Sequence, residues 1–464
     1  MLILPVLSSY KIYLMNARNT LTLLAVSLML TGCSSVTWDE VNLMPPPDVY
    51  SDGMLDPLPE QDPMDLIPYQ GLLYATDRRP AGLDDNEKYY ANDRGQLVRL
   101  GVASISLHEA DVDWAEVREI SLLKSRTDKY PLRVTGVQEY GILEDTIPGF
   151  AKREDYGDDL LDGEEEFAAA VNAQLARSNR KHVYIYVHGY KVVFENPMLV
   201  ATELWHFLGY DGVMIGFAWP STPSNWAYIR DTDTSNGYAR NFRKFLEFLA
   251  EKTYVEEIHI VAYSNGTRLA ARAFEQLALM NDGKPREEIH ARHRLGNLIM
   301  VSSDLDRQVF SAYLADGAFD VPRHMSIYVS DKDKALGVAR WLTRRERLGQ
   351  VIDENKLSPA AKRALEEHKD HISMIDVSDA EGADTGNGHG YFRNSPWASS
   401  DILMMLMHDL TPEQRGLRLK ASMPVYEFPP DYINKLWAAL AEIDPDFRRA
   451  YMARQIKQND DQQP

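Results

Sequence analysis

Short apolar runs rich in β-branched residues alternate with longer segments of helical periodicity between about residues 165 and 410. Apolar runs of this length are typical of strands buried on both faces of a parallel sheet. The alternation therefore predicts an α/β fold with a doubly wound, mainly parallel sheet that helices cover on both faces. The expected strands are Val183–Val187, Val213–Ala218, Ile258–Ala262, Leu298–Val301, Ser326–Val329 and Ile372–Val377. The expected helices are residues 164–178, Pro197–Leu208, Ala239–Glu251, Thr267–Met280, Lys334–Arg347 and one that begins at Ser358.

The only cysteine, Cys33, follows the N-terminal apolar run Thr20–Leu30. This run is too short to span a bilayer, which needs ~20 residues, but it suits a secretory signal. The sequence Leu30-Thr31-Gly32-Cys33 resembles a bacterial lipoprotein signal, in which the cysteine carries the lipid. The resemblance implies a membrane anchor on Cys33, a true start at Met15 and, because Ser34 follows, the outer membrane of a Gram-negative cell envelope. The alternative is a buried cysteine in an ordinary helix.

The remaining segments differ in composition from the α/β part. The stretch 34–66, after Cys33, is rich in proline and acidic residues, a composition typical of tethers. The stretch 67–150 contains short runs of alternating apolar and polar residues, which predict strands. We therefore expect a signal peptide at 1–33, a flexible tether at 34–66, a β-rich region at 67–150, the α/β domain at 165–410 and a helical C-terminal extension at 411–464.

Charge and missing motifs exclude several classes of function. The chain has 50 Lys and Arg against 69 Asp and Glu, a formal net charge of -19, which disfavours nucleic acid as a partner. One cysteine excludes an internal disulfide framework and Cys-based zinc sites. The HExxH, phosphate-loop and GxGxxG motifs are missing where they would have to lie, so we expect neither a metal nor a cofactor.

Ser264 is the candidate nucleophile. It lies where the strand Ile258–Ala262 passes directly into the helix Thr267–Met280. Small residues two before and two after such a serine let the backbone turn sharply and lift the hydroxyl above the sheet, and Ala262 and Gly266 occupy these positions. The alternative is a serine that only caps the helix.

His389 is the candidate base. A serine hydroxyl is a weak nucleophile and needs a base, which in turn needs an acid to orient it. In folds with a serine on this kind of turn, the acid and then the histidine follow later in the chain. His389 lies in the Gly-rich loop after the strand Ile372–Val377 and meets this expectation.

The acid has three candidates. Asp333 and Asp331 both follow the strand Ser326–Val329, and Asp333 is preferred. Asp304, after the strand Leu298–Val301, is the other alternative, because some enzymes place the acid after the preceding strand.

Acyl transfer also needs backbone N–H groups directed at the developing oxyanion. Asn265, directly after the serine, supplies one at the start of a helix. The loop His188-Gly189-Tyr190 follows an earlier strand, so the N–H of Tyr190 is the expected second donor. We expect a structural role for His188 because it precedes the serine in the chain.

A series of motifs in chain order carries a family resemblance: Val187-His188-Gly189-Tyr190, Phe217-Ala218-Trp219-Pro220-Ser221, Ala262-Tyr263-Ser264-Asn265-Gly266, Ser303-Asp304-Leu305-Asp306, Ser330–Leu336 and Gly388-His389-Gly390-Tyr391. Together they resemble an uncharacterised bacterial α/β-hydrolase family, catalogued as a domain of unknown function. The resemblance covers about residues 180–410, extends faintly to Leu73–Arg78, and implies an α/β-hydrolase fold with Asp333 as the acid. The family's usual run is His-Ser-Met-Gly-Asn, whereas this chain has Tyr263, Asn265 and Thr267 at the differing places. The resemblance implies no substrate.

These observations predict a membrane-anchored serine hydrolase that cleaves a carboxylic ester, or a thioester or amide, through an acyl-enzyme on Ser264. The rival interpretation is a catalytically silent scaffold that binds a cell-envelope partner. Two further features stay open. The aromatic residues expected near the site are candidates for the lining of an apolar acyl pocket: Trp219, Trp226, Tyr228 and Tyr190. For Trp219, packing in the core is an equal alternative. Residues Lys334–Ala361 form a lid, a membrane-facing patch or an ordinary solvated helix.

Overall fold

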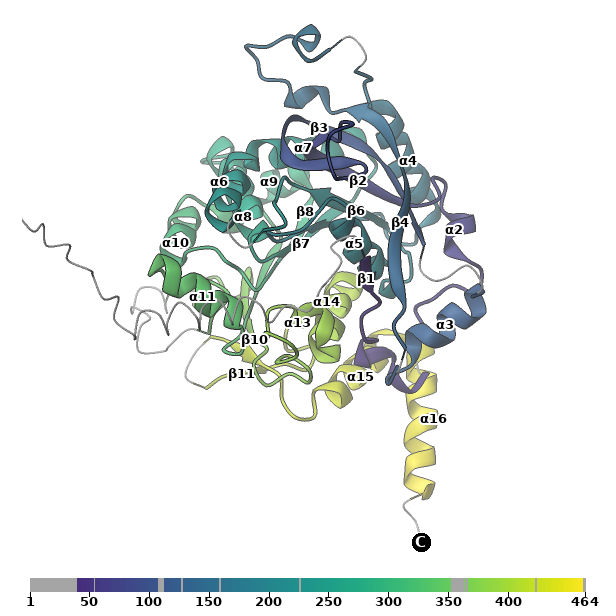
Figure 1. The fold of residues 1–464 in the computed structure, drawn as a ribbon. Coiled ribbons are helices and arrows are strands. Elements are labelled where there is room, and N and C mark those ends of the chain that lie inside the picture. The colour runs from purple at the N-terminus through teal and green to yellow at the C-terminus, as the bar shows by residue number, and fades with distance from the viewer. Residues whose placement is uncertain are drawn as a thin grey trace, which may run out of the picture. The chain divides into compact units, whose positions relative to one another are not determined.

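The computed structural model describes residues 40–461 except 54, 107–111, 127, 158–159, 225–226, 352–362, 364–365 and 422–423. In this part of the chain one 12-stranded sheet has the order β1-β4-β3-β2-β6-β5-β7-β8-β9-β10-β12-β11 (Figure 1). Its strands are β1 Glu40–Asn42, β2 Leu72–Pro80, β3 Tyr90–Ser106, β4 Pro131–Ile142, β5 His182–Val187, β6 Val213–Ala218, β7 Glu257–Tyr263, β8 Leu295–Val301, β9 His324–Val329, β10 Ile372–Asp376, β11 Arg418–Leu419 and β12 Tyr426–Glu427.

The centre of the sheet is parallel and its edges are antiparallel. Parallel pairing runs without interruption from β2 through β6, β5, β7, β8, β9 and β10 to β12. The strands β1, β4 and β3 add antiparallel pairs on one side, and β11 adds one on the other. The six strands predicted from the apolar runs are β5 to β10, so the prediction of a mainly parallel α/β fold is confirmed.

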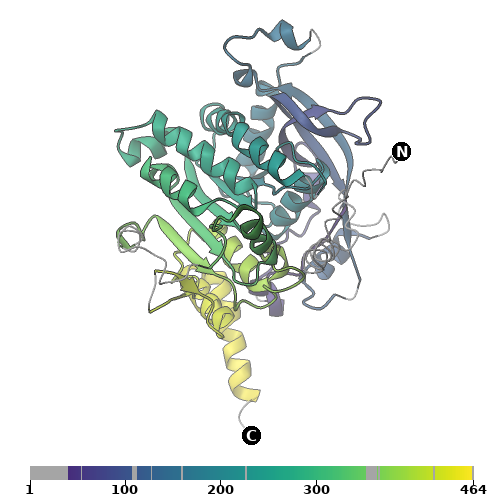
Figure 2. The same ribbon diagram turned by 60° about the vertical axis from the view of Figure 1, so that its left-hand side comes forward.

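Side chains of the central strands alternate between two hydrophobic cores, one on each face of the sheet. On β5, Val183, Ile185 and Val187 enter one core, whereas Tyr184 and Tyr186 enter the other. The first core is covered by α4 Glu164–Arg177, α7 Ala239–Lys252, α8 Gly266–Met280 and α10 Arg307–Ala315. The second is covered by α5 Glu195–Phe207, α14 Pro396–His408 and α15 Tyr432–Ile443 (Figure 2). The layering is therefore doubly wound, with helices on both faces.

The other helices are shorter or lie at the periphery. They are α2 Pro63–Leu66, α3 Trp114–Leu122, α6 Tyr228–Gly237, α9 Arg286–His293, α11 Lys334–Thr343, α13 Tyr391–Asn394 and α16 Pro445–Asp461. The helix expected over Lys334–Arg347 ends early because Arg344 adopts a left-handed conformation at its C-cap. The helix expected from Ser358 lies outside the described residues. Among the described residues, no helix has the length and apolar character needed to cross a bilayer.

The prediction of a flexible tether at 34–66 is wrong for the part that the structure describes. β1 pairs with β4, and the segment after it buries Val49 and Tyr50 completely in the core of α14 and α15. The indole N–H of Trp437 donates to the carbonyl of Val49 over 3.1 Å. Composition does not distinguish the two cases, because prolines and acidic residues also occur in irregular segments that pack against a folded body. Residues Trp38–Pro464 form one compact unit.

The two flanking regions join the same sheet. The expected strands of residues 67–150 are present as β2, β3 and β4, and β2 pairs directly with β6 of the hydrolase part. The segment 411–464 is not purely helical, because β12 and β11 extend the sheet beyond β10. Ile372–Val377 is therefore not the last strand, although it is the last long one. Cys33 and the signal segment lie outside the described residues.

Candidate active site

Ser264 lies on the turn between β7 and α8, above the carboxyl edge of the parallel strands. Its φ of 52° is left-handed, which is uncommon for a residue with a side chain and typical of a serine lifted out of a strand-to-helix turn. The Ser264 N–H donates to the carbonyl of Val301, and the Thr267 hydroxyl donates to the carbonyl of Ser264 at 2.6 Å. Gly266 is required for close approach, since a Cβ there would lie 2.3 Å from the carbonyl oxygen of His188. These contacts hold the backbone of Ser264 in its left-handed conformation.

His389 reaches Ser264 from the loop after β10. Its Nε2 lies 2.9 Å from the Ser264 Oγ, within hydrogen-bond distance. The Ser302 hydroxyl donates to the His389 carbonyl at 2.7 Å, and the Tyr263 ring packs on the imidazole with centroids 5.1 Å apart. Gly388 has a φ of 70°, and a Cβ there would lie 2.3 Å from the carbonyl oxygen of Lys332. The histidine loop therefore lies directly against the loop that carries the acid.

Asp333 completes the hydrogen-bonded chain. Its Oδ2 accepts from Nδ1 of His389 at 2.7 Å, and its Oδ1 accepts from the N–H of Leu336 at 3.0 Å, which caps α11. The carboxylate is fully buried, and the His389 side chain is 12% exposed. Burial alone lowers the pKa of His389, but the Asp333 carboxylate and, more weakly, Asp304 raise it above its ordinary value of 6.5. The imidazole is thus held in the tautomer whose Nε2 lone pair faces the serine.

The two other aspartates are placed differently. Both oxygens of Asp304 accept from the hydroxyl of Tyr228, at 3.0 and 2.9 Å, and Arg268 and Arg347 lie 3.4 and 3.3 Å from the carboxylate. Asp304 therefore does not orient the histidine, although its charge acts on it. Asp331 is exposed and forms an ion pair with Lys332. Of the three candidates, the structure brings only Asp333 to Nδ1 of His389.

The expected oxyanion donors belong to two segments that adjoin the serine: the start of α8 and the loop His188-Gly189-Tyr190. Asn265 is the N-cap of α8, so its backbone N–H is at the positive end of that helix. Its side chain is held by α6: the Ser235 hydroxyl donates to Oδ1 at 2.7 Å, and Nδ2 donates to the Thr232 hydroxyl at 3.2 Å. On the other side, a Cβ on Gly189 would lie 3.0 Å from the Ser264 Cβ, so the loop that carries Tyr190 packs against the nucleophile.

The structure distinguishes core aromatics from site aromatics. Trp219 is fully buried, stacks on the ring of His188 and donates its indole N–H to the His188 carbonyl at 2.7 Å. Burial, reinforced by the charge of Arg78, lowers the pKa of His188 well below its ordinary value. Its Nδ1 lies 2.6 Å from the carbonyl of Gly189 and its Nε2 3.1 Å from the carbonyl of Trp219, contacts that suit the structural role expected for it. Tyr190 and Tyr228 are only half-buried, and their rings pack edge to face at 5.4 Å. Trp226 lies outside the described residues.

The helix after the acid carries exposed apolar residues. Trp341 and Leu342, at the end of α11, are 61% and 58% exposed. Residues 352–361 of the segment Lys334–Ala361 lie outside the described part, so a lid in this place stays a prediction.

A second cluster of titratable groups consists of His182, Glu257 and His259. These residues lie at the N-terminal ends of β5 and β7, at the edge of the sheet opposite the candidate active site. The N–H of Asn297 donates to Nδ1 of His259 at 3.0 Å, and burial lowers the pKa of His259 to about 3. The ring is therefore neutral with its proton on Nε2, which lies 3.2 Å from Nδ1 of His182. A protonated Nε2 is not a metal ligand, so the chemistry of this cluster fits a hydrogen-bonded pair better than a metal site.

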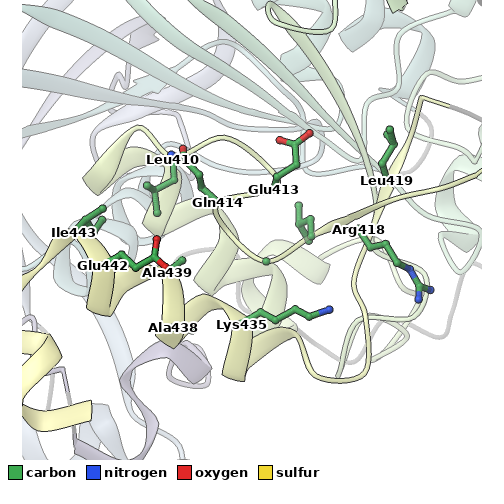
Figure 3. Close-up of a pocket in the computed structure, with 12 residues that line it drawn as sticks. Leu410, Glu413, Gln414, Arg418, Leu419, Lys435, Ala438, Ala439, Glu442 and Ile443 are labelled. Carbon is green, nitrogen blue, oxygen red and sulfur yellow. The ribbon is translucent and has the colours of Figure 1, made fainter. Parts of the chain in front are cut away.

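A hollow of about 600 Å³ lies elsewhere in the fold, between α15 and the loop before β11 (Figure 3). Its walls mix apolar and charged side chains, including Leu410, Glu413, Lys435 and Ile443. None of Ser264, His389 and Asp333 contributes to it. The hollow is therefore separate from the candidate active site.

A mainly parallel sheet with a serine on a strand-to-helix turn, and an acid and a histidine following in that order, defines the α/β-hydrolase class. The model of one such family, described as an alpha/beta hydrolase of unknown function (DUF900), matches residues 163–406. The match covers more than half of the chain, and the protein belongs to this family. Comparison with curated proteins found no significant match, and neither did comparison with solved structures.

Two neighbours of the candidate site were not predicted from the sequence: α6, which holds the side chain of Asn265, and Arg78, which contacts the loop after Tyr190. α6 was not predicted, because the run Tyr228–Gly237 is polar and poor in strong helix formers. Arg78 entered the sequence-based interpretation only as the last residue of Leu73–Arg78, a segment in which the family resemblance is faint. The one available signal was its place in Thr76-Asp77-Arg78, where a charged pair directly follows an apolar run.

Proposed function

We propose that this protein is a serine hydrolase that cleaves a carboxylic ester through an acyl-enzyme on Ser264. The observation that carries the proposal is the continuous chain of hydrogen bonds from Ser264 through His389 to Asp333, with distances of 2.9 and 2.7 Å. Such a chain supplies an activated nucleophile in a protein whose family is one of hydrolases. The same chemistry applies to thioesters and amides, which are the other substrate classes within the proposal.

In the proposed reaction, Oγ of Ser264 attacks the acyl carbon while Nε2 of His389 takes its proton. The N–H groups of Asn265 and Tyr190 stabilise the negative charge on the former carbonyl oxygen. The intermediate collapses, the bond to the leaving alcohol breaks, and His389 returns the proton to the alcohol oxygen. Water then attacks the acyl-enzyme by the same route and releases the acid and free Ser264. Asp333 keeps the imidazole in one tautomer and stabilises its charged form.

The proposal includes a lipid anchor on Cys33 and a place at the outer membrane of a Gram-negative cell. The sequence around Cys33 supports it. The test is fractionation of cells that express Cys33→Ala. We expect this variant to leave the membrane fraction, and continued co-sedimentation with membranes would contradict the anchor.

The test of the catalytic proposal is labelling of the purified full chain with a fluorophosphonate probe. The serine oxygen attacks phosphorus and fluoride leaves, so labelling reports an activated serine without knowledge of the substrate. We expect the wild type to label, and Ser264→Ala and His389→Ala to lose labelling while keeping the wild-type circular dichroism. A folded wild type that does not label would favour the silent scaffold instead.

A further inference from the structure

Arg78 is a fully buried arginine that lies outside the family match yet reaches the loops of the active site. It is on β2, and its guanidinium contacts two loops at the carboxyl edge of the sheet: the loop after β5, which contains Val192, and the loop after β6, which contains Ser221. Nη2 donates to the carbonyl of Val192 at 2.9 Å and to the hydroxyl of Ser221 at 3.3 Å. Nη1 donates to Oδ1 of Asn92 at 2.8 Å and to the carbonyl of Ser221 at 3.4 Å.

These contacts fix the loop that carries the second oxyanion donor. Val192 follows Tyr190 by two residues, and Lys191 between them has a left-handed φ of 69°. The Ser221 hydroxyl donates to the Val192 carbonyl at 2.9 Å and accepts from the Val192 N–H at 3.3 Å. The Ser221 hydroxyl therefore binds both the N–H and the carbonyl of Val192. Arg78 donates to the carbonyl of Val192 and to the hydroxyl of Ser221, and so holds the two residues together. The sharp turn at Tyr190 has one end on β5 and the other on this junction.

The charge of Arg78 is maintained despite its burial. Burial lowers its pKa to about 10, while the surrounding carboxylates, Glu195 foremost, oppose this effect. The guanidinium therefore stays protonated at neutral pH. Its charge also contributes to the lowered pKa of His188, at the start of the same loop. Burying a cation is costly, so a guanidinium kept between the loops of Val192 and Ser221 is better explained by the positioning of these loops than by general packing.

The loop of Ser221 connects this junction to the first oxyanion donor. The N–H of Thr222 donates to Oδ2 of Asp231 on α6 at 2.8 Å. One residue further along α6, the hydroxyl of Thr232 accepts from the side chain of Asn265. Polar contacts between residues that are adjacent along the chain thus connect Arg78, through Ser221 and α6, to Asn265.

We propose that Arg78 is a positioning residue for the oxyanion hole: it sets the place of the Tyr190 N–H by clamping Val192 to Ser221. The proposal rests on the proposed function. It gives the N-terminal strand β2, outside the matched residues 163–406, a part in the hydrolase site. Arg78 does not touch the reacting atoms, so its loss should lower stabilisation of the oxyanion without changing the titration of His389.

The experiment measures the second-order rate constant of fluorophosphonate labelling as a function of pH for the full chain. Arg78→Met keeps an unbranched apolar stem and removes the guanidinium with its donors, and Ser221→Ala is the milder variant should Arg78→Met fail to fold. Removal of one oxyanion donor lowers rates by about 10² to 10³ in other serine hydrolases. We expect a displaced donor to lower labelling about 10- to 100-fold at every pH, with the midpoint of the pH profile unchanged.

Arg415→Met is the matched control, because Arg415 is as deeply buried and binds Asp401 in another part of the fold. All rates are taken below each variant's melting temperature and normalised to folded protein. Wild-type rates in both folded Arg78→Met and Ser221→Ala, or a loss as large in Arg415→Met, would overturn the proposal. A wild type that does not label would refute the proposed function itself, so the two failures are distinguishable.

Discussion

Replacing Asp333 by asparagine reverses the tautomer of His389, and the geometry of the carboxylate predicts this. The N–H of Leu336 donates to Oδ1, and Nδ1 of His389 faces Oδ2. A backbone N–H can only donate a hydrogen bond. In Asp333→Asn the amide oxygen therefore keeps accepting from the N–H of Leu336, and the NH₂ group faces the histidine. An NH₂ group donates to a lone pair, which moves the ring proton from Nδ1 to Nε2. A protonated Nε2 cannot take the proton of Ser264.

The expected loss is large and specific to the reaction. In a Ser-His-Asp enzyme with the corresponding substitution, the tautomer change lowers kcat by about 10⁴, or about 5 kcal/mol of transition-state stabilisation. Stability should change little, because asparagine caps a helix about as well as aspartate does. We therefore expect Asp333→Asn to melt within a few degrees of the wild type while labelling about 10⁴-fold more slowly.

The assay is the fluorophosphonate rate constant measured across pH, beside a melting curve. The wild-type rate should rise with pH as His389 loses its proton, with a midpoint above ~6.5, because the carboxylate raises the pKa of that histidine. Asp331→Asn is the matched control: it removes an exposed carboxylate two residues away and should label at the wild-type rate. An Asp333→Asn rate within tenfold of the wild type would refute the tautomer argument.

Further substitutions test the surroundings of the site. Asp304→Asn removes a charge that raises the pKa of His389, so the rising limb of the labelling profile should move to lower pH; an unmoved limb would count against this coupling. Gly388→Ala places a Cβ 2.3 Å from a backbone carbonyl at a φ of 70°, so we expect slower labelling and a lower melting temperature, measured together. Arg415→Ala leaves the buried Asp401 charge unpaired, which should cost about 3–5 kcal/mol in denaturant unfolding. Wild-type stability in that variant would show that other groups compensate the charge.

The central strands and the Ser-His-Asp chain were predictable because their signals are local. A strand buried on both faces is an apolar run in any context, and the order of serine, acid and histidine follows the order of the strands. From the sequence, Asp333 was preferred to Asp304 on the order of the strands and on the family resemblance, and neither ground excludes Asp304. The structure separates them by partners, since the Asp304 carboxylate is already engaged by Tyr228.

The packing of residues 40–66 was not predictable because it depends on partners far along the chain. Val49 accepts from Trp437, which lies 388 residues away, and Tyr50 donates to the carbonyl of Phe207. No periodicity in a proline-rich segment reports such contacts. The strands β11 and β12 were missed for a similar reason: each has two residues and exists through its pairing with a neighbour.

The departures from the family's usual nucleophile run become intelligible in the structure. Tyr263 packs between His389 and Phe392, with ring centroids 5.1 and 4.9 Å apart, so the position before the serine supports the histidine loop. Asn265, after the serine, replaces an apolar side chain with an amide, and α6 supplies the hydroxyls of Thr232 and Ser235 that bind it. A buried amide without such partners is costly, so this residue and the polar sequence of α6 depend on each other. The polar sequence of α6, which gave no signal of a helix, thus supplies the hydroxyl groups that bind Asn265 next to the nucleophile.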